Sequence, residues 1–403
     1  MLSYQDALET VLRTIRPLPV EEVPLPEAWG SVLADAVAAR WDMPPADNSA
    51  MDGYAFAAAG LAAGEGLAVA GVSRAGAGFP GQVASGEAVK IMTGAPMPAG
   101  CDTVVPFEDV VERDDRIWPQ RPVQTGDHVR RQGEEFRASE TLLTAGTLLR
   151  AGEIGLLAAA GMAQVRVHRR PQVALLTTGD ELVDLGVAPG PGQIVNSNRY
   201  LLAARLREEG YAVRELGTGP DSAAGLTEQL AQGLEADLLL TTGGVSVGDY
   251  DLVQSCLGAI GFQLGFWKVA IKPGKPVLFG TVEGTPVFGL PGNPAAAAAT
   301  FQLFVMPALR RLAGRQDPHG AFCRATLAAP VRGGGNRQRF LWGRVEEKNG
   351  VYHFTPSGRQ GSGQNRSLQG AQALLPVAAG SPDLAAGEKV EIILIYLPQR
   401  SAA

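Results

Sequence analysis

Residues 237–251 read DLLLTTGGVSVGDYD, in which an apolar run leads directly into a glycine-rich turn that carries two carboxylates. The uninterrupted leucines at 238–240 are typical of a strand covered on both faces, as in a parallel sheet. Residues 246–251 can open a helix, whose first backbone N–H groups have no partner inside the helix and suit a phosphate or another oxyanion. The stretch therefore predicts an anion site at the end of a buried strand.

Asp249 and Asp251 complicate this prediction, because a carboxylate that faces a phosphate repels it unless a cation lies between them. A divalent metal would resolve the conflict, and magnesium is the usual ion where one or two carboxylates share it with phosphate oxygens. The alternative is that both aspartates only cap the following helix. The loop by itself favours a ligand site over this alternative.

The composition indicates a folded chain of several domains. Its 403 residues suffice for about two to four domains, and 45% of them are hydrophobic, which excludes a disordered chain. A net charge of -6 leaves no basic surface for nucleic acid. No apolar run approaches the roughly 20 residues that span a bilayer, so no membrane partner is expected. Three widely separated cysteines fit neither a disulfide framework nor a metal site and favour a cytoplasmic location.

Strand and helix patterns alternate from about residue 171 to 315, which predicts a doubly wound parallel sheet with ligands at the carboxyl ends of its strands. A helix is expected over 221–236, with Asp221 at its N-cap. A strand that runs into a loop is expected over QVALLTTGDEL (172–182). Further strands are expected at 211–219 and 237–244 and around FWKVAI (266–271), PVLFG (276–280) and PVFGL (286–290), and further helices at 196–210, 253–257 and 294–314.

The flanking regions are expected to be mainly β. Short extended runs between glycine and proline clusters, from about 20 to 139, indicate a small β-rich domain. Residues 152–161 favour a helix, and the first 15 residues form an amphipathic helix pattern. After about residue 320 the strand patterns return and suggest a C-terminal β-barrel or sandwich.

Two further loops of the alternating region carry polar groups. TTGDE (177–181) is a second strand-to-loop turn with adjacent carboxylates, Asp180 and Glu181, which either share a metal with the first acidic loop or simply cap the next element. WKVAIKPGKP (267–276) supplies three lysines between stiffening prolines, either for a ligand with several negative oxygens or as a solvated cluster.

GLPGNP (289–294) can bring bare backbone close to a ligand, because it sets prolines and glycines between a strand and a helix. It is not a Walker A loop, since Pro276 follows the lysine of GKP, and no GxGxxG ends a strand, so dinucleotide redox chemistry is unsupported. Asp52 and Thr93 lie in turns of the β-rich region that are ordinary by themselves.

Eight motifs, in this order, resemble the MoeA family of molybdopterin molybdenumtransferases, whose eukaryotic relatives include the E domain of gephyrin. The resemblance covers nearly the whole chain. The motifs are NSAMDGYA (48–55), IMTGAPMP (91–98), RRQGEE (130–135), TTGDEL (177–182), TTGGVSVGDYD (241–251), KPGKP (272–276), GLPGNP (289–294) and SGRQGSG (357–363).

The resemblance implies a homodimer of multidomain α/β and β subunits. Each subunit would combine a doubly wound, molybdopterin-binding α/β domain with a linker domain, a β-rich lid and a C-terminal β-barrel-like domain. The implied boundaries are 1–19, 38–46 and 140–170 for the linker domain, 20–37 and 47–139 for the lid, 171–319 for the α/β domain and 320–403 for the C-terminal domain.

The resemblance also implies the reaction. Molybdenum from molybdate would be inserted into adenylylated molybdopterin with magnesium present, the phosphoanhydride being cleaved with release of AMP. A molybdopterin adenylyltransferase would act upstream as a partner. Two other readings remain open: a non-catalytic scaffold that uses the same dimeric fold, and an adenylyltransferase that shares the α/β domain.

Site residues are carried over by matching motif positions. Those implied for catalysis are Asp52, Thr93, Glu181, Asp221, Asp251, Lys268 and Lys272, with Glu181 and Asp251 also implied as metal ligands. Those implied for substrate binding are Glu135, Gly243, Gly244, Ser246, Gly248, Lys275, Pro291, Gly292, Asn293, Pro294 and Ser362. The resemblance implies a cleft between the lid of one subunit and the α/β domain of the other.

Three positions depart from the family pattern. Glu135 stands where an aspartate is common, which lengthens the acidic arm by one methylene. Ala296 stands where the family has a serine, so an anion contact is lost. Trp342 stands where many members have an arginine, a charge that Arg339 or Arg344 could supply instead.

Overall fold

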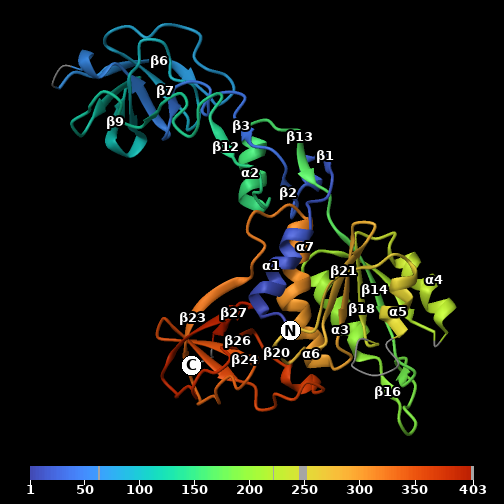
Figure 1. Ribbon diagram of the computed structural model, residues 1–403. Coiled ribbons are helices and arrows are strands. Elements are labelled where there is room, and N and C mark those ends of the chain that lie inside the picture. Colours follow the sequence, from blue (N-terminus) through green and yellow to red (C-terminus); the bar gives the residue numbers. More distant parts are fainter. Residues whose placement is uncertain (62–63, 221, 245–251, 401–403) are drawn as a thin grey trace. The chain divides into compact units, whose positions relative to one another are not determined.

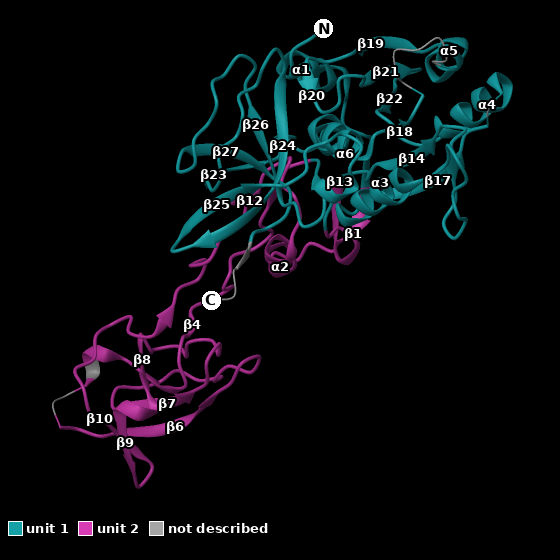
Figure 2. Ribbon diagram, turned by 90° about the horizontal axis from the view of Figure 1, so that it is seen from below, with its two compact units in different colours: residues 1–21, 30–34, 167–403 teal, residues 22–29, 35–166 magenta. Residues whose placement is uncertain are grey.

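The computed structural model describes residues 1–61, 64–220, 222–244 and 252–400 (Figure 1). The chain divides into two compact units, which are described separately (Figure 2). The first comprises residues 1–21, 30–34 and 167–403, and the second residues 22–29 and 35–166. A three-stranded sheet has the order β1-β13-β2, with β1 (Val20–Pro24), β13 (Gln164–His168) and β2 (Val32–Leu33). The division into four domains stays a prediction.

A six-stranded sheet of order β17-β14-β18-β22-β21-β19 is the centre of the first unit. The first four strands of this order are parallel. Strand β21 pairs antiparallel with β22, and β19 pairs antiparallel with β21, so the sheet is mixed at one side. The strands are β14 (Gln172–Thr177), β17 (Ala212–Thr218), β18 (Leu238–Thr242), β19 (Gln263–Trp267), β21 (Leu278–Val282) and β22 (Thr285–Leu290).

Helices cover both faces of this sheet, which confirms the doubly wound fold (Figure 1). Val173 and Leu175 of β14 pack in one core with α1, α3, α6 and α7, whereas the alternate residues Ala174 and Leu176 pack in a second core with α4 and α5. The helices are α1 (Tyr4–Thr14), α3 (Ser197–Glu208), α4 (Ala223–Gly233), α5 (Leu252–Ala259), α6 (Pro294–Thr300) and α7 (Met306–Leu312).

Three local expectations need correction. Helix α4 is capped by Ser222, whose hydroxyl accepts a hydrogen bond from the N–H of Gly225, so Asp221 is not the N-cap. The run FWKVAI is not one strand: a left-handed backbone at Lys268 (φ 70°) separates β19 from β20 (Ile271–Lys272). The long helix after β22 contains a π-helical segment, η4 (Phe301–Val305), between α6 and α7.

The C-terminal strands form a closed barrel. The ring β24-β25-β23-β27-β26 closes because β24 pairs with both β25 and β26. Of the two predicted architectures, barrel and sandwich, the structure therefore confirms the barrel. Strand β20 joins the ring through β24, as does β28 (Gln399–Arg400). The ring strands are β23 (Ala321–Leu327), β24 (Gln338–Lys348), β25 (Val351–Pro356), β26 (Ala373–Val377) and β27 (Lys389–Leu394).

The second unit is mainly β, as expected, and its described residues include one α-helix, α2 (Ala151–Ala159). Its sheet has the order β8-β5-β7-β6-β10-β9, with Tyr54 and Phe56 among its buried core residues. The strands are β5 (Gly53–Phe56), β6 (Leu67–Ser73), β7 (Glu87–Ile91), β8 (Thr103–Pro106), β9 (Val110–Arg113) and β10 (Arg116–Pro119), with the short pairs β3 (Val37–Ala38) and β12 (Thr141–Leu143), and β4 (Asn48–Ser49) and β11 (Val129–Arg130).

No helix within the described ranges is long and apolar enough to cross a membrane. All three cysteines are free.

Candidate functional site

The carboxyl ends of β14, β18 and β22 meet at one edge of the sheet of the first unit. Thr177 pairs with Thr242, and Thr242 pairs with Leu290. The turns that follow are tied together as well, because the N–H of Thr178 donates to the carbonyl of Thr242 (2.9 Å) and the N–H of Gly243 donates to that of Leu290 (3.1 Å). The TTGDE, TTGG and GLPGNP loops are thus neighbours, as the alternating pattern predicts.

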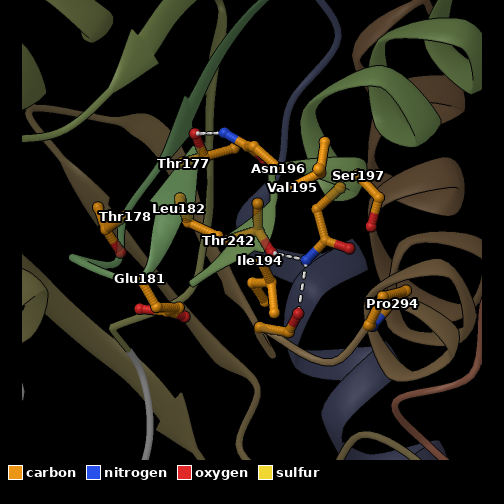
Figure 3. Close-up of a pocket in the computed structure, with 12 residues that line it drawn as sticks. Thr177, Thr178, Glu181, Leu182, Ile194, Val195, Asn196, Ser197, Thr242 and Pro294 are labelled. Carbon is orange, nitrogen blue, oxygen red and sulfur yellow. Dashed lines mark hydrogen bonds between the residues drawn. The ribbon is translucent and has the colours of Figure 1, made fainter. Parts of the chain in front are cut away.

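A pocket of about 40 Å³ opens between these turns and the start of α3 (Figure 3). Thr178 and Glu181 lie on one side of it, and Ser197 and Pro294 on the other. Because one water needs about 10–15 Å³ of such volume, the pocket has room for only a few water-sized groups, and a larger ligand must extend beyond it. The lining residues are Thr177, Thr178, Glu181, Leu182, Ile194, Val195, Asn196, Ser197, Asn198, Thr242, Gly292 and Pro294.

Asn198 connects three of the elements around the pocket. Its Nδ2 donates to Thr242 Oγ1 (2.9 Å) and to the carbonyl of Gly292 (2.7 Å). A carbonyl oxygen can only accept a hydrogen bond, so the amide orientation is fixed. Asn198 is 8% exposed, and its Oδ1 has no hydrogen-bond partner among the residues that the structure describes. The sequence pattern did not single out Asn198, since an asparagine at a helix start indicates a cap.

Two of the expected binding glycines are required by the fold itself. A Cβ on Gly243 (φ 90°) would lie 2.1 Å from the carbonyl oxygen of Thr178. A Cβ on Gly244 (φ 62°) would lie 2.6 Å from Val253 Cγ2. Gly292 differs, because the only atom near its added Cβ is the Cα of Gly243, at 3.6 Å. Of the three glycines, Gly292 therefore leaves open space at the pocket.

The GLPGNP and SGRQGSG motifs meet at the N-terminus of α6. The carbonyl of Ser362 accepts hydrogen bonds from the N–H groups of Ala295 (2.9 Å) and Ala296 (3.3 Å), and Asn293 Nδ2 donates to Ser362 Oγ (3.3 Å). These interactions bring the expected residues Asn293, Pro294 and Ser362 together. They also give a partner to the N–H of Ala295 in the first turn of α6, whereas the N–H of Ala296 is shared with the carbonyl of Asn293 (3.1 Å).

Two departures from the family pattern fall at the same helix. Ala296 is 2% exposed, and Trp342 is 7% exposed. The indole Nε1 of Trp342 donates to the carbonyl of Ala295 (3.2 Å). The tryptophan therefore anchors the first turn of α6, in place of a charge at this position. Nη1 of Arg339 donates to the carbonyls of Arg332 (2.8 Å) and Gly333 (3.2 Å).

The three lysines lie in the connection from β19 to β21. Lys268 Nζ lies 3.5 Å from the centroid of the Trp267 ring. The N–H of Val269 donates to the carbonyl of Lys275 (3.0 Å), and Lys272 is exposed in β20. In the part of the chain that the structure describes, none of the three lysines forms an ion pair.

The second unit brings Asp52 and Thr93 together. Asp52 Oδ1 accepts hydrogen bonds from the backbone N–H of Thr93 (2.6 Å) and from its hydroxyl (2.9 Å). These bonds, the backbone one first, lower the pKa of the exposed Asp52 carboxyl below its ordinary value. Glu135 is exposed in the same unit, where its N–H donates to the carbonyl of Met43 (2.9 Å).

Four expected site residues lie outside the described residues: Asp221, Ser246, Gly248 and Asp251. Of the two predicted metal ligands, Glu181 and Asp251, the structure therefore describes only Glu181, which lines the pocket. Over residues 1–61, 64–220, 222–244 and 252–400, no group of three or more acidic, histidine or cysteine side chains could hold a metal ion.

Comparison with known families and structures gives one consistent result. Residues 2–161 match the MoeA N-terminal region (domain I and II), residues 174–311 a probable molybdopterin binding domain, and residues 324–395 the MoeA C-terminal region (domain IV).

Full-length relatives agree. Molybdopterin molybdenumtransferases of Nostoc sp. and Haemophilus influenzae are each 36% identical to this chain. The match to the Nostoc protein covers 94% of this chain and 89% of the Nostoc chain, and the match to the Haemophilus protein covers 89% of this chain and 88% of the Haemophilus chain. The crystal structure of the molybdopterin biosynthesis moeA protein from Pyrococcus horikoshii OT3 superposes with a TM-score of 0.84 at 30% identity, covering 98% of this chain and all of that one. This chain therefore belongs to the MoeA family of molybdopterin molybdenumtransferases.

Proposed function

We propose that this chain inserts molybdenum from molybdate into adenylylated molybdopterin and that AMP is released in the reaction. One observation carries the proposal: the chain is 36% identical, over 94% of its length, to a protein named molybdopterin molybdenumtransferase. The site supports it, because a parallel sheet binds ligands at the carboxyl ends of its strands, where Thr178, Glu181 and Gly292 line one pocket.

Cleavage of the phosphoanhydride would rest on positioning and charge stabilisation. The lysines Lys268, Lys272 and Lys275 carry positive charge that no described carboxylate neutralises in an ion pair, which suits phosphate and molybdate oxygens. Gly292 leaves room for a ligand to approach the backbone. The polar residues proposed to act on the substrate are Asp52, Thr93, Glu181, Asp221 and Asp251.

Magnesium fits the donors at the sheet edge. Glu181 and Thr178 line the same pocket, and Thr178 Oγ1 is buried without a hydrogen-bond partner in the described part of the chain. Carboxylate and hydroxyl oxygens are hard ligands of the kind that Mg²⁺ takes. We propose that Glu181 and Asp251 hold the ion. When bound, it would offset the negative charge of the phosphoanhydride.

The expected partners are a second copy of this chain and an upstream molybdopterin adenylyltransferase. The second follows from the chemistry, since adenylylated molybdopterin must be made by an enzyme that transfers an adenylyl group. Sedimentation velocity of the purified chain tests the first: a species of about 84 kDa is expected for a dimer of a 42.1 kDa chain (2 × 42.1 = 84.2). The cytoplasmic location also stays a prediction.

The reaction is tested by mixing the purified protein with adenylylated molybdopterin, magnesium and molybdate, and following AMP and the finished cofactor. We expect AMP release that depends on molybdate. Glu181→Gln keeps the size of the side chain but removes its charge, and should reduce the rate strongly. Asp184→Asn is the matched control, because Asp184 is a largely exposed carboxylate of the same region that only pairs with Arg199 at 3.5 Å. The absence of molybdate-dependent AMP release would overturn the proposed function.

A further inference from the structure

The ammonium of Lys268 lies against the face of the neighbouring indole. Its Nζ is 3.5 Å from the centroid of the Trp267 ring. The other cation-over-ring pairs of the described residues have separations of 4.8 Å to 5.6 Å. A cation is attracted to the negative face of an aromatic ring, most strongly to that of tryptophan. This pair is thus the closest contact of its kind in the described structure.

The backbone is turned to make this contact. Trp267 is the last residue of β19, opposite Leu278 of β21. Phe266 is buried in the core shared with α1, and Trp267 packs against the core on the other face of the sheet. Strand alternation would place Lys268 on the Phe266 side. Instead Lys268 adopts φ 70°, and its N–H donates to the carbonyl of Val277 (3.1 Å).

A left-handed backbone is uncommon for a residue other than glycine, and it persists only where the surroundings determine it. The indole N–H does not fix the ring, since Trp267 Nε1 is buried without a hydrogen-bond partner as far as the structure describes the chain. The ring is therefore held by apolar packing and by the ammonium on its face.

This contact leaves the hydrogen-bonding capacity of Lys268 unused. An ammonium has three N–H donors, and the lysine forms no ion pair with any carboxylate among the described residues. We propose that Trp267 is a positioning residue: its indole backs the Lys268 ammonium and directs the remaining donors at an oxyanion of the substrate. The inference rests on the proposed function for the anion itself, which is either a phosphate of the adenylylated pterin or molybdate.

Binding of simple anions to the full-length protein tests the inference without turnover. Isothermal titration with molybdate and, separately, with pyrophosphate distinguishes the two sources of the oxyanion. Trp267→Leu should weaken binding of one of them on the order of two- to fivefold, the range of a partly exposed cation–aromatic contact. Trp267→Phe keeps an aromatic face and should retain most of the affinity. Leu264→Ala, at an exposed position of the same strand, is the control and should bind as the wild type does.

The decisive comparison is made in the Lys268→Met background. There Trp267→Leu should cause no further loss of anion affinity, because the indole no longer has an ammonium to position. Three results would overturn the inference. The first is equal anion affinity of the Trp267→Phe and Trp267→Leu variants. The second is a loss of affinity on adding Trp267→Leu to Lys268→Met that is as large as its loss in the wild type, and the third is that the wild type binds neither anion. AMP release, measured separately, decides the proposed function. If the effects of Trp267 and Lys268 on anion affinity are coupled but no AMP is released, the positioning role of Trp267 stands and the proposed function fails.

Discussion

Replacing Gly243 by alanine tests whether the sheet edge depends on close approach of two backbones. The new Cβ would lie 2.1 Å from the carbonyl oxygen of Thr178, whereas real Cβ contacts essentially never fall below 3.0 Å. The carbonyl cannot move freely, because the N–H of Thr178 is bonded to Thr242 at 2.9 Å. A left-handed backbone costs about 1–2 kcal/mol without glycine, and overpacking adds about 1–3 kcal/mol. We expect Gly243→Ala to lower the free energy of unfolding by about 2–5 kcal/mol.

Two glycines of the same sheet separate these contributions. Gly284 has φ 88° and no atom within 4 Å of an added Cβ, so Gly284→Ala should show the backbone cost alone. Gly292 meets only the Cα of Gly243, at 3.6 Å, so Gly292→Ala should fold as the wild type does. If the space at Gly292 belongs to a ligand, Gly292→Ala should still reduce molybdate-dependent AMP release.

Scanning calorimetry of the wild type and the three variants measures the comparison, with circular dichroism as a check on the fold. The order of stability should be wild type and Gly292→Ala, then Gly284→Ala, then Gly243→Ala. A Gly243→Ala protein as stable as Gly284→Ala would refute the contact with the Thr178 carbonyl. A fully active Gly292→Ala protein would refute the ligand space.

Three further variants test single contacts. Asn198→Asp replaces the donor to the Gly292 carbonyl, now at 2.7 Å, by an acceptor. Unfolding experiments should show a loss of about 1–3 kcal/mol in the free energy of unfolding, and unchanged stability would contradict the bridge. Thr93→Val removes the hydroxyl bond that helps to lower the pKa of Asp52, so an NMR titration should find this pKa higher than in the wild type. The Asp52 carboxylate stabilises the fold above its unfolded pKa, and in the variant this stabilisation should be lost at a higher pH as the solution is acidified. An unchanged pKa of Asp52 would disprove the role of the hydroxyl. Asp251→Ala should abolish turnover while sedimentation still shows a dimer, and wild-type rates would rule out its metal role.

The sequence predicts the sheet edge well, because its signals are local. An uninterrupted apolar strand such as 238–240 needs no partner to be recognised, and glycines after a strand indicate a sharp turn wherever the strand lies. The hydrogen bond between Asp52 and Thr93 could not be predicted in this way, since the two residues are 41 positions apart.

The remaining features depend on distant partners. Asp221 and Ser222 are equally good caps by residue type, and the geometry of the turn selects Ser222. Nothing in FWKVAI shows that Lys268 turns left-handed, because the cause is its contacts with Trp267 and Val277. The importance of Asn198 was missed since its carbonyl partner lies 94 residues along the chain. Closure of the C-terminal barrel likewise requires pairings between strands that are far apart in sequence.

The first turn of α6 belongs to two domains at once. The N–H groups of Ala295 and Ala296 donate to the carbonyl of Ser362, and the carbonyl of Ala295 accepts a hydrogen bond from the Trp342 indole. Both partners come from the C-terminal part of the chain, whereas the helix follows directly from the sheet edge. An α/β domain taken alone would therefore leave the N–H of Ala295 without this partner, whereas the N–H of Ala296 would keep its bond to the carbonyl of Asn293 (3.1 Å). The C-terminal part of the chain thus completes the hydrogen bonding of the first turn of α6, so the α/β fold and the C-terminal strands depend on each other at this helix.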